Sequence, residues 1–213
     1  HSVSVLADAV AKGLNIDKNL ALEACVSSSN VNYYDGIDQY RERGYVPLER
    51  SASAASITME YSYDDWTINQ LAKRLNRSDI ENQYAERALN YRNVFDRSLG
   101  FARPKLADGS FKKDFDLLDT HGQGFIEGNS WNYSFFVPHD VFGLIREMGG
   151  EKQFVRRLDS LFTMKLPAKY FENTEDISEE GLMGNYVHGN EPSHHVAYLY
   201  KWTDEPWKSE YRL

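Results

Sequence analysis

The sequence has a single cysteine, Cys25, among its 213 residues. One thiol forms neither an internal disulfide nor a two-cysteine metal site, so no covalent cross-link within the chain is expected. Its neighbours Ala24 and Val26 are apolar, which indicates a buried position on a helix and a structural role. The cysteine count leaves the cellular compartment open, because bacterial secreted proteins need not carry disulfides.

Long apolar runs are also missing. No stretch reaches the eighteen apolar residues of a membrane span, and no signal-peptide pattern opens the chain. Basic residues are outnumbered, with 24 Lys and Arg against 32 Asp and Glu, for a formal net charge of −8. This balance argues against nucleic-acid binding and against electrostatic docking on anionic membranes, which both need basic patches. We therefore expect no nucleic-acid partner and no membrane span.

Aromatic residues, by contrast, are abundant: 14 Tyr, 11 Phe and 4 Trp make up 14% of the chain. Such side chains build a hydrophobic core, or they line a groove in which flat rings stack on a ligand such as a sugar. Composition leaves both uses open, with core packing the more frequent one.

The apolar periodicity predicts a succession of helices. They are expected over residues 3–11, 18–26, 37–43, 51–75, 79–95, 139–148, 152–162 and 193–202. Asp17 and Ser78 are expected to cap two of them, and Pro192 suits the first turn of another. One short strand is expected where Trp131, Tyr133 and Phe135 alternate. An all-α fold of helical hairpins joined by long aromatic-rich loops, closing as part of a toroid, fits this pattern.

Three familiar motifs are absent or only superficially matched. The glycine-rich run at residues 122–128 has neither the GxGxxG spacing nor the strand–turn–helix context of a dinucleotide site. The GxSxG elbow of serine hydrolases and the HExxH zinc motif do not occur.

A cluster of metal-binding residue types lies near the C-terminal end. It contains His188, Glu191, His194 and His195. Their spacing matches no common zinc pattern, and adjacent histidines on a helix point about 100° apart. Oxygen donors are richer here, since Asn185, Asn190 and Glu191 occur together, and calcium prefers six to eight oxygen ligands.

Two groups of carboxylates are candidates for chemistry. Glu127 follows Ile126 in an aromatic neighbourhood, and apolar surroundings raise a carboxyl pKa and make the group a usable proton donor. Asp64 and Asp65 precede Trp66 within the longest expected helix. In each case a purely structural hydrogen-bonding role remains open, and the aspartates either contact a sugar hydroxyl or anchor a neighbouring loop.

Several segments together resemble a known family. They read GYVPLE at 44–49, TMEYSYDDW at 58–66, EGNSWNYSFFVPHD at 127–140, LIREMGG at 144–150 and GNYVHGNEPSHHVAYLY at 184–200. In these motifs, in their order, the chain closely resembles glycoside hydrolase family 92, the calcium-dependent exo-α-mannosidases. The resemblance covers nearly the whole chain.

The resemblance implies a fold and an activity. Residues 1–213 would form part of an (α/α)6 catalytic toroid, without the family's preceding β-sandwich domain and without the C-terminal part of the catalytic domain. Such enzymes remove terminal α-linked mannose from mannans or N-glycans with inversion. The resemblance also implies a secreted, periplasmic or bacterial cell-surface location.

The resemblance also implies roles for individual residues. Glu127 would be the general acid, and calcium (Ca²⁺) would bind two vicinal mannose hydroxyls with Glu191, Asn190 and Asn185 as ligand candidates. We expect Trp131, Asp64, Asp65, His194 and His195 to contact the substrate.

Two departures from the family pattern limit these expectations. The family's base, an aspartate in a D-x-G-x-M-S type motif, has no counterpart in these residues, so the chain alone is expected to be inactive. The His-Glu pair of α-1,2-selective members is also missing, since residues 177–181 read ISEEG. Other linkages therefore stay open. A non-catalytic carbohydrate-binding protein and a helical interaction scaffold are the alternatives, and the edges of an incomplete toroid could self-associate.

Overall fold

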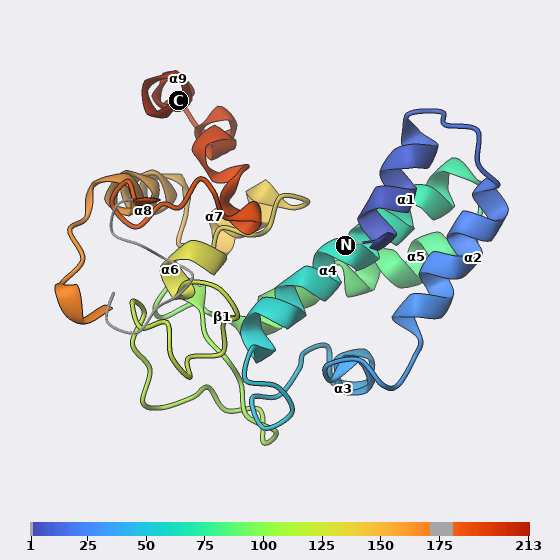
Figure 1. Ribbon diagram of the computed structural model, residues 1–213, viewed down its shortest axis with the longest axis horizontal. Coiled ribbons are helices and arrows are strands. Elements are labelled where there is room, and N and C mark those ends of the chain that lie inside the picture. Colours follow the sequence, from blue (N-terminus) through green and yellow to red (C-terminus); the bar gives the residue numbers. More distant parts are fainter. Residues whose placement is uncertain (1, 171–180) are drawn as a thin grey trace.

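The computed structural model describes residues 2–170 and 181–213, and helices dominate this part of the chain (Figure 1). The N-terminal helices are α1 (Ser2–Ala11), α2 (Lys18–Ser29), α3 (Ile37–Arg43), α4 (Ala54–Arg74) and α5 (Ser78–Arg87). After the 3-10 helix η1 (Asn90–Val94) come the strands β1 (Phe95–Asp96) and β2 (Phe101–Ala102). The C-terminal elements are α6 (Ser130–Tyr133), α7 (Val141–Glu147), α8 (Glu151–Thr163), η2 (Ala168–Tyr170), η4 (Glu191–Ser193), η5 (Val196–Trp202) and α9 (Trp207–Arg212).

Helix α4 is the longest described element and connects two groups of elements. Its C-terminal half packs with α1, α2 and α5, while its N-terminal end reaches the loops and short helices of the other group (Figure 1). The first group encloses a core that includes Leu22, Cys25, Ile68 and Tyr84. Cys25 is buried there as a free thiol, which confirms its structural placement.

The second group has a larger, aromatic-rich core. Its fully buried members include Tyr91, Phe135, Leu144, Phe154 and Tyr200. Aromatic abundance thus reflects core packing to a large extent, and the long loop between β2 and α6 adds Phe125 to the same core.

Local signals at two helix starts have different outcomes. Asp17 caps α2 as expected, because its Oδ1 accepts hydrogen bonds from the main-chain N–H of Asn19 and Leu20, each at 3.0 Å. The expectation for Ser78 is wrong: Ser78 is already helical, Arg77 precedes it, and no side chain caps α5.

The helix expected over 79–95 is shorter than its pattern indicates. It ends at Arg87, and Phe95 begins a β-hairpin in which Phe95 pairs with Ala102. The Asp96 carboxylate accepts a hydrogen bond from the Ser98 N–H at 3.0 Å, and Gly100 adopts a positive φ of 70°. A tight turn therefore overrides the helical spacing of the apolar residues.

The strand expected around Trp131 is also wrong. Asn129 caps a helical turn there: its side chain accepts from the Asn132 N–H at 3.2 Å, and the Asn132 side chain accepts from the Asn129 N–H at 3.0 Å. This reciprocal capping box fixes α6 and overrides the alternating pattern. The helix expected over 193–202 is likewise replaced by η4 and η5, with Pro192 in the first turn of η4.

Helix α7 begins at a half-buried group of polar side chains. One oxygen of Asp140 accepts from the Gly143 N–H at 2.9 Å, and the other accepts from the Tyr91 hydroxyl at 2.8 Å and from Arg92 at 2.7 Å. A Cβ at Gly143 would overlap the Asp140 carboxylate and the Tyr91 hydroxyl, so this close approach needs glycine.

Among the described helices, none combines the length and the apolar character that crossing a membrane requires.

Candidate active site

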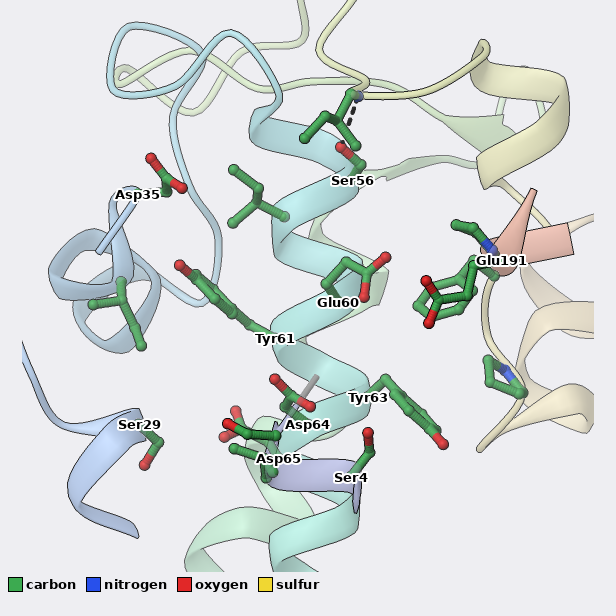
Figure 2. Close-up of a pocket in the computed structure, with 18 of the residues that line it drawn as sticks. Ser4, Ser29, Asp35, Ser56, Glu60, Tyr61, Tyr63, Asp64, Asp65 and Glu191 are labelled. Atoms are coloured by element: carbon green, nitrogen blue, oxygen red, sulfur yellow. Dashed lines mark hydrogen bonds between the residues drawn. The ribbon is translucent and has the colours of Figure 1, made fainter. Parts of the chain in front are cut away.

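A cavity of about 820 Å³ runs beside α4 (Figure 2). Ser56, Glu60, Tyr63 and Asp64 line it from one face of that helix, because residues four, seven and eight positions apart share a face. Facing them are residues from the segment around α6 and from η4 and its flanks. These include Ile126, Glu127, Tyr133, Phe136, Glu191, Pro192, His194 and His195.

Three glutamates from distant parts of the sequence meet at this cavity. Glu60 belongs to α4, Glu127 to the loop before α6, and Glu191 to η4. Burial raises the pKa of Glu60 from 4.5 to about 7, and the negative charges of Asp64, Glu127 and Glu191 add to the rise. In Figure 2 the Glu60 side chain extends from α4 toward the side on which Glu191 lies. The cavity therefore concentrates negative charge and carries one carboxyl that is half protonated near neutral pH.

The loop that carries Glu127 is bound to the first turn of α4. The Gly124 carbonyl accepts hydrogen bonds from the N–H of Ala55 at 2.9 Å and of Ser56 at 3.3 Å. The Ile126 N–H donates in turn to the Ser56 hydroxyl at 3.1 Å, which is the dashed line in Figure 2. Main-chain donors at a helix start have no partner within the helix, so the loop satisfies them and is held against α4.

Gly128 completes the placement of Glu127. Its φ is +73°, and a Cβ at this position would collide with the Asn132 side chain. A residue with a side chain would be strained in this conformation, so glycine is required between the carboxylate and the cap of α6.

The asparagines of the two longest motifs bind one another. The Asn185 amide donates to Asn129 Oδ1 at 3.2 Å, and Asn129 donates back to Asn185 Oδ1 at 3.4 Å. The Asn132 amide also donates to the Asn185 main-chain carbonyl. Asn185 is fully buried in this network and does not line the cavity, so its side-chain oxygen is already engaged.

The side chains of Asp64 and Asp65, which were expected to contact the substrate, point in different directions from α4. Asp64 lies at the cavity, and burial raises its pKa. Asp65 also borders the cavity, but it is 2% exposed and its Oδ2 accepts from the Tyr40 hydroxyl at 2.7 Å and from Arg87 at 2.9 Å. Its carboxylate thus joins α4 to α3 and α5.

Of the aromatic and imidazole side chains expected to contact the substrate, some lie at the cavity and one does not. Trp131 is not among the cavity residues, and its ring packs on Phe101 with centroids 4.5 Å apart. His194 and His195 both line the cavity. His195 is anchored, because its Nε2 donates to the Phe135 carbonyl at 2.9 Å and burial lowers its pKa.

Few of the described side chains at the cavity could bind a metal ion together. Among the described residues, no three His, Cys, Asp or Glu side chains are grouped so that they could hold a metal ion together. Glu60 and Glu191 nevertheless present carboxylate oxygens at the cavity, and Asn190 directly precedes η4. A calcium ion there would complete its shell with amide, main-chain, water or sugar oxygens, as is common for this ion.

Glu60 and Tyr133 are among the cavity residues that the sequence did not predict as part of the site. A signal for Glu60 was present, because it stands four residues before Asp64 and so shares its helix face. No comparable local signal marks Tyr133, whose alternation with neighbouring aromatics indicated a strand instead. Most of the segment at residues 177–181, which bears on linkage, lies outside the described residues.

Comparisons with known proteins agree on one family. A family model described as "Glycosyl hydrolase family 92 catalytic domain" matches residues 1–213. The structure of a family GH92 alpha-mannosidase from Bacteroides thetaiotaomicron is 40% identical and has a TM-score of 0.91, covering 99% of this chain and 28% of that chain. That of a family GH92 inverting mannosidase from Bacteroides thetaiotaomicron VPI-5482 is 36% identical and has a TM-score of 0.85, covering 98% of this chain and 30% of that chain.

A curated relative adds a second organism. An uncharacterized secreted glycosidase from Arthroderma benhamiae is 28% identical over 241 residues, which cover 95% of this chain and 29% of that protein. The chain thus spans less than a third of the length of these relatives. The structural likeness confirms the expected all-α fold as part of an (α/α)6 toroid.

Proposed function

This chain belongs to glycosyl hydrolase family 92, and on that premise we propose that it carries the acid side of an active site that hydrolyses terminal α-linked mannose from mannans or N-glycans. The meeting of Glu127 with Glu60 and Glu191 at one cavity is the observation that carries the proposal. A relative's structure supports the substrate class, because the alpha-mannosidase that is 38% identical to this chain is in complex with mannoimidazole.

Glu127 acts as the general acid in this proposal. It gives its proton to the glycosidic oxygen while the bond from that oxygen to C1 of mannose breaks. A water molecule adds to C1 from the opposite face and loses its proton to a second carboxylate, so the released mannose has inverted configuration. The chain supplies the acid and not this base. The first turn of α4 and Gly128 keep the Glu127 loop in place for the transfer.

Calcium is the proposed cofactor, with Glu191 and Asn190 as ligands and Glu60 as a further oxygen donor. When bound, the ion would supply positive charge for two vicinal mannose hydroxyls and favour a distorted sugar ring. Burial raises the pKa of Glu60, and the charges of Asp64, Glu127 and Glu191 raise it further; this concentration of negative charge supports a cation at this place. Asn185 contributes indirectly, since its amide pairs with Asn129 next to the acid loop.

Mannose-containing glycans are the proposed partners, with Asp64 and His194 at the cavity as substrate contacts. A secreted, periplasmic or cell-surface location is proposed with them. The name of the Arthroderma benhamiae relative, a secreted glycosidase, supports export. Self-association through the apolar edges of the incomplete toroid is proposed from the sequence.

The test compares Glu127→Gln with the parent in the intact protein. The variant should lose mannose release by orders of magnitude on a methyl α-mannoside, and much less on an activated aryl α-mannoside, whose leaving group needs little protonation. Glu23→Gln, an exposed glutamate on α2, is the matched control and should change neither rate. Equal losses on both substrates would remove Glu127 from the acid role.

A carbohydrate-binding protein without catalysis is distinguished in the same experiment. It would bind mannosides in the parent and in Glu127→Gln alike, with no release of mannose from either substrate. Nuclear magnetic resonance of the first product formed would check inversion, since an inverting enzyme releases β-mannose from an α-linkage.

A further inference from the structure

The last residue of α6, Tyr133, differs from the other fully buried tyrosines. Those are Tyr40, Tyr84, Tyr91 and Tyr200, and the hydroxyl of each is hydrogen-bonded to a neighbouring side chain. Tyr133 is 2% exposed, yet its hydroxyl has no hydrogen-bond partner anywhere in residues 2–170 and 181–213. Buried phenols normally find a partner, because an unpaired hydroxyl away from water costs free energy.

The Tyr133 hydroxyl reaches the cavity rather than the core. The residue lines the cavity, and its oxygen is not among the side-chain atoms that are both sealed from solvent and unpaired. The ring, by contrast, packs between Phe125 and Phe136, with centroids 5.9 Å and 6.2 Å away. The side chain thus has an apolar body in the core and a polar tip at the site.

The surroundings of this tip keep it protonated. Burial raises the pKa of Tyr133 far above its usual range, and the negative charges of Glu60, Glu127 and Glu191 raise it further. At neutral pH the group is therefore a hydrogen-bond donor. Three carboxylates around it are hydrogen-bond acceptors when ionised, so a donor is the scarcer group here.

We propose that the Tyr133 hydroxyl contacts the substrate directly, donating a hydrogen bond to an oxygen of the sugar that binds among Glu60, Glu127 and Glu191. This inference rests on the proposed function, because it assumes a sugar in the cavity. Sugars offer hydroxyl and ether oxygens, and the ether oxygens accept hydrogen bonds only. The phenol supplies what the carboxylates cannot when they are ionised.

Stability and function should respond to Tyr133→Phe in opposite directions. Phenylalanine keeps the packing on Phe125 and Phe136 and removes a hydroxyl that has no partner among the described residues, so the melting temperature should stay the same or rise. The loss of the donor should lower kcat/KM for a methyl α-mannoside tenfold to about a hundredfold, the size of one hydrogen bond to a substrate. The affinity for the same mannoside, measured by calorimetry, should fall as well.

Tyr84→Phe is the matched control. Tyr84 is equally buried, but its hydroxyl binds Ser29 between α5 and α2. This variant should lower the melting temperature and leave kcat/KM unchanged. If Tyr133→Phe behaves in this way too, with a lower melting temperature and unchanged kinetics, the hydroxyl has a structural role and the proposal fails.

The outcomes also separate this inference from the proposed function. Unchanged kinetics in Tyr133→Phe together with a slow Glu127→Gln would overturn the tyrosine contact alone. Weaker mannoside binding by Tyr133→Phe, in a protein whose Glu127→Gln variant is unaffected, would uphold the contact and overturn the acid role. An intact protein that neither binds nor hydrolyses mannosides would overturn both.

Discussion

Glu60 on α4 and Glu127 before α6 face the same cavity, close enough that the charge of Glu127 contributes to the raised pKa of Glu60. Their proximity follows from the hydrogen bonds of the Glu127 loop to the first turn of α4.

The raised pKa of Glu60 predicts a pH-dependent stability. The folded chain binds this proton more tightly than the unfolded chain, so the stabilisation is complete below pH 4.5 and is lost as the pH rises through about 7. The Gln side chain of Glu60→Gln cannot ionise, so burying it carries no charge penalty. With a chelator present to remove metal ions, the variant should have a higher melting temperature than the parent at pH 8 and the same melting temperature at pH 4. Glu23→Gln, at an exposed position, serves as control. An equal change in the melting temperature of Glu60→Gln at both pH values would show that the ionisation of Glu60 is not the cause.

Calcium should stabilise the intact protein through the same cavity. A ligand that binds only the folded state at a hundredfold its Kd adds about 2.7 kcal/mol to the free energy of unfolding. The melting temperature should therefore rise with calcium, less so with magnesium, and Glu191→Gln should lose most of the rise. An undiminished rise in Glu191→Gln would place the ion elsewhere.

Asp65 should prove structural although its neighbour Asp64 serves the cavity. Asp65→Asn breaks a buried ion pair with Arg87 and should cost about 3–5 kcal/mol of stability, measured by urea unfolding. At a temperature where it is folded, mannoside affinity should match that of the parent. Asp64→Asn should show the reverse, with little loss of stability and weaker binding.

Replacing Gly128 should lower the stability of the protein for two reasons that can be measured separately. Gly128→Ala imposes a side chain on a φ of +73° and a collision with Asn132. Gly109→Ala has a similar φ of +86° with nothing within 4 Å of its Cβ, so it isolates the backbone cost of about 1 kcal/mol. Gly128→Ala should lose more stability than Gly109→Ala and should slow mannose release, and equal effects would show that the collision is relieved without cost.

The 213-residue chain by itself should bind mannosides weakly and release no mannose, because the base is not among its proposed groups. An assay of purified chain with methyl α-mannoside and calcium checks this. Calcium-dependent release above the level of Glu127→Gln would show that a carboxylate of this chain serves as base.

Features that depend on neighbours in the sequence were predictable. Asp17 caps α2 because a cap is formed by the residue and the next three main-chain groups, and Gly44 ends α3 because a left-handed residue is needed there. The same holds for the family, since its motifs preserve local requirements such as a glycine between Glu127 and the cap of α6.

The sequence by itself thus determined the helical class and the family, and it led to the proposal of Glu127 as the acid. Only the tertiary structure decided which other side chains meet that carboxylate. Asp64 and Asp65 are adjacent and chemically equal, and the packing of α4 against α3 and α5 turns one into an ion pair with Arg87. The packing of the helices also brings the side chains of Glu60 and Tyr133 to the cavity. Which side chains point into a common cavity depends on how the helices pack, and no local sequence pattern encodes it.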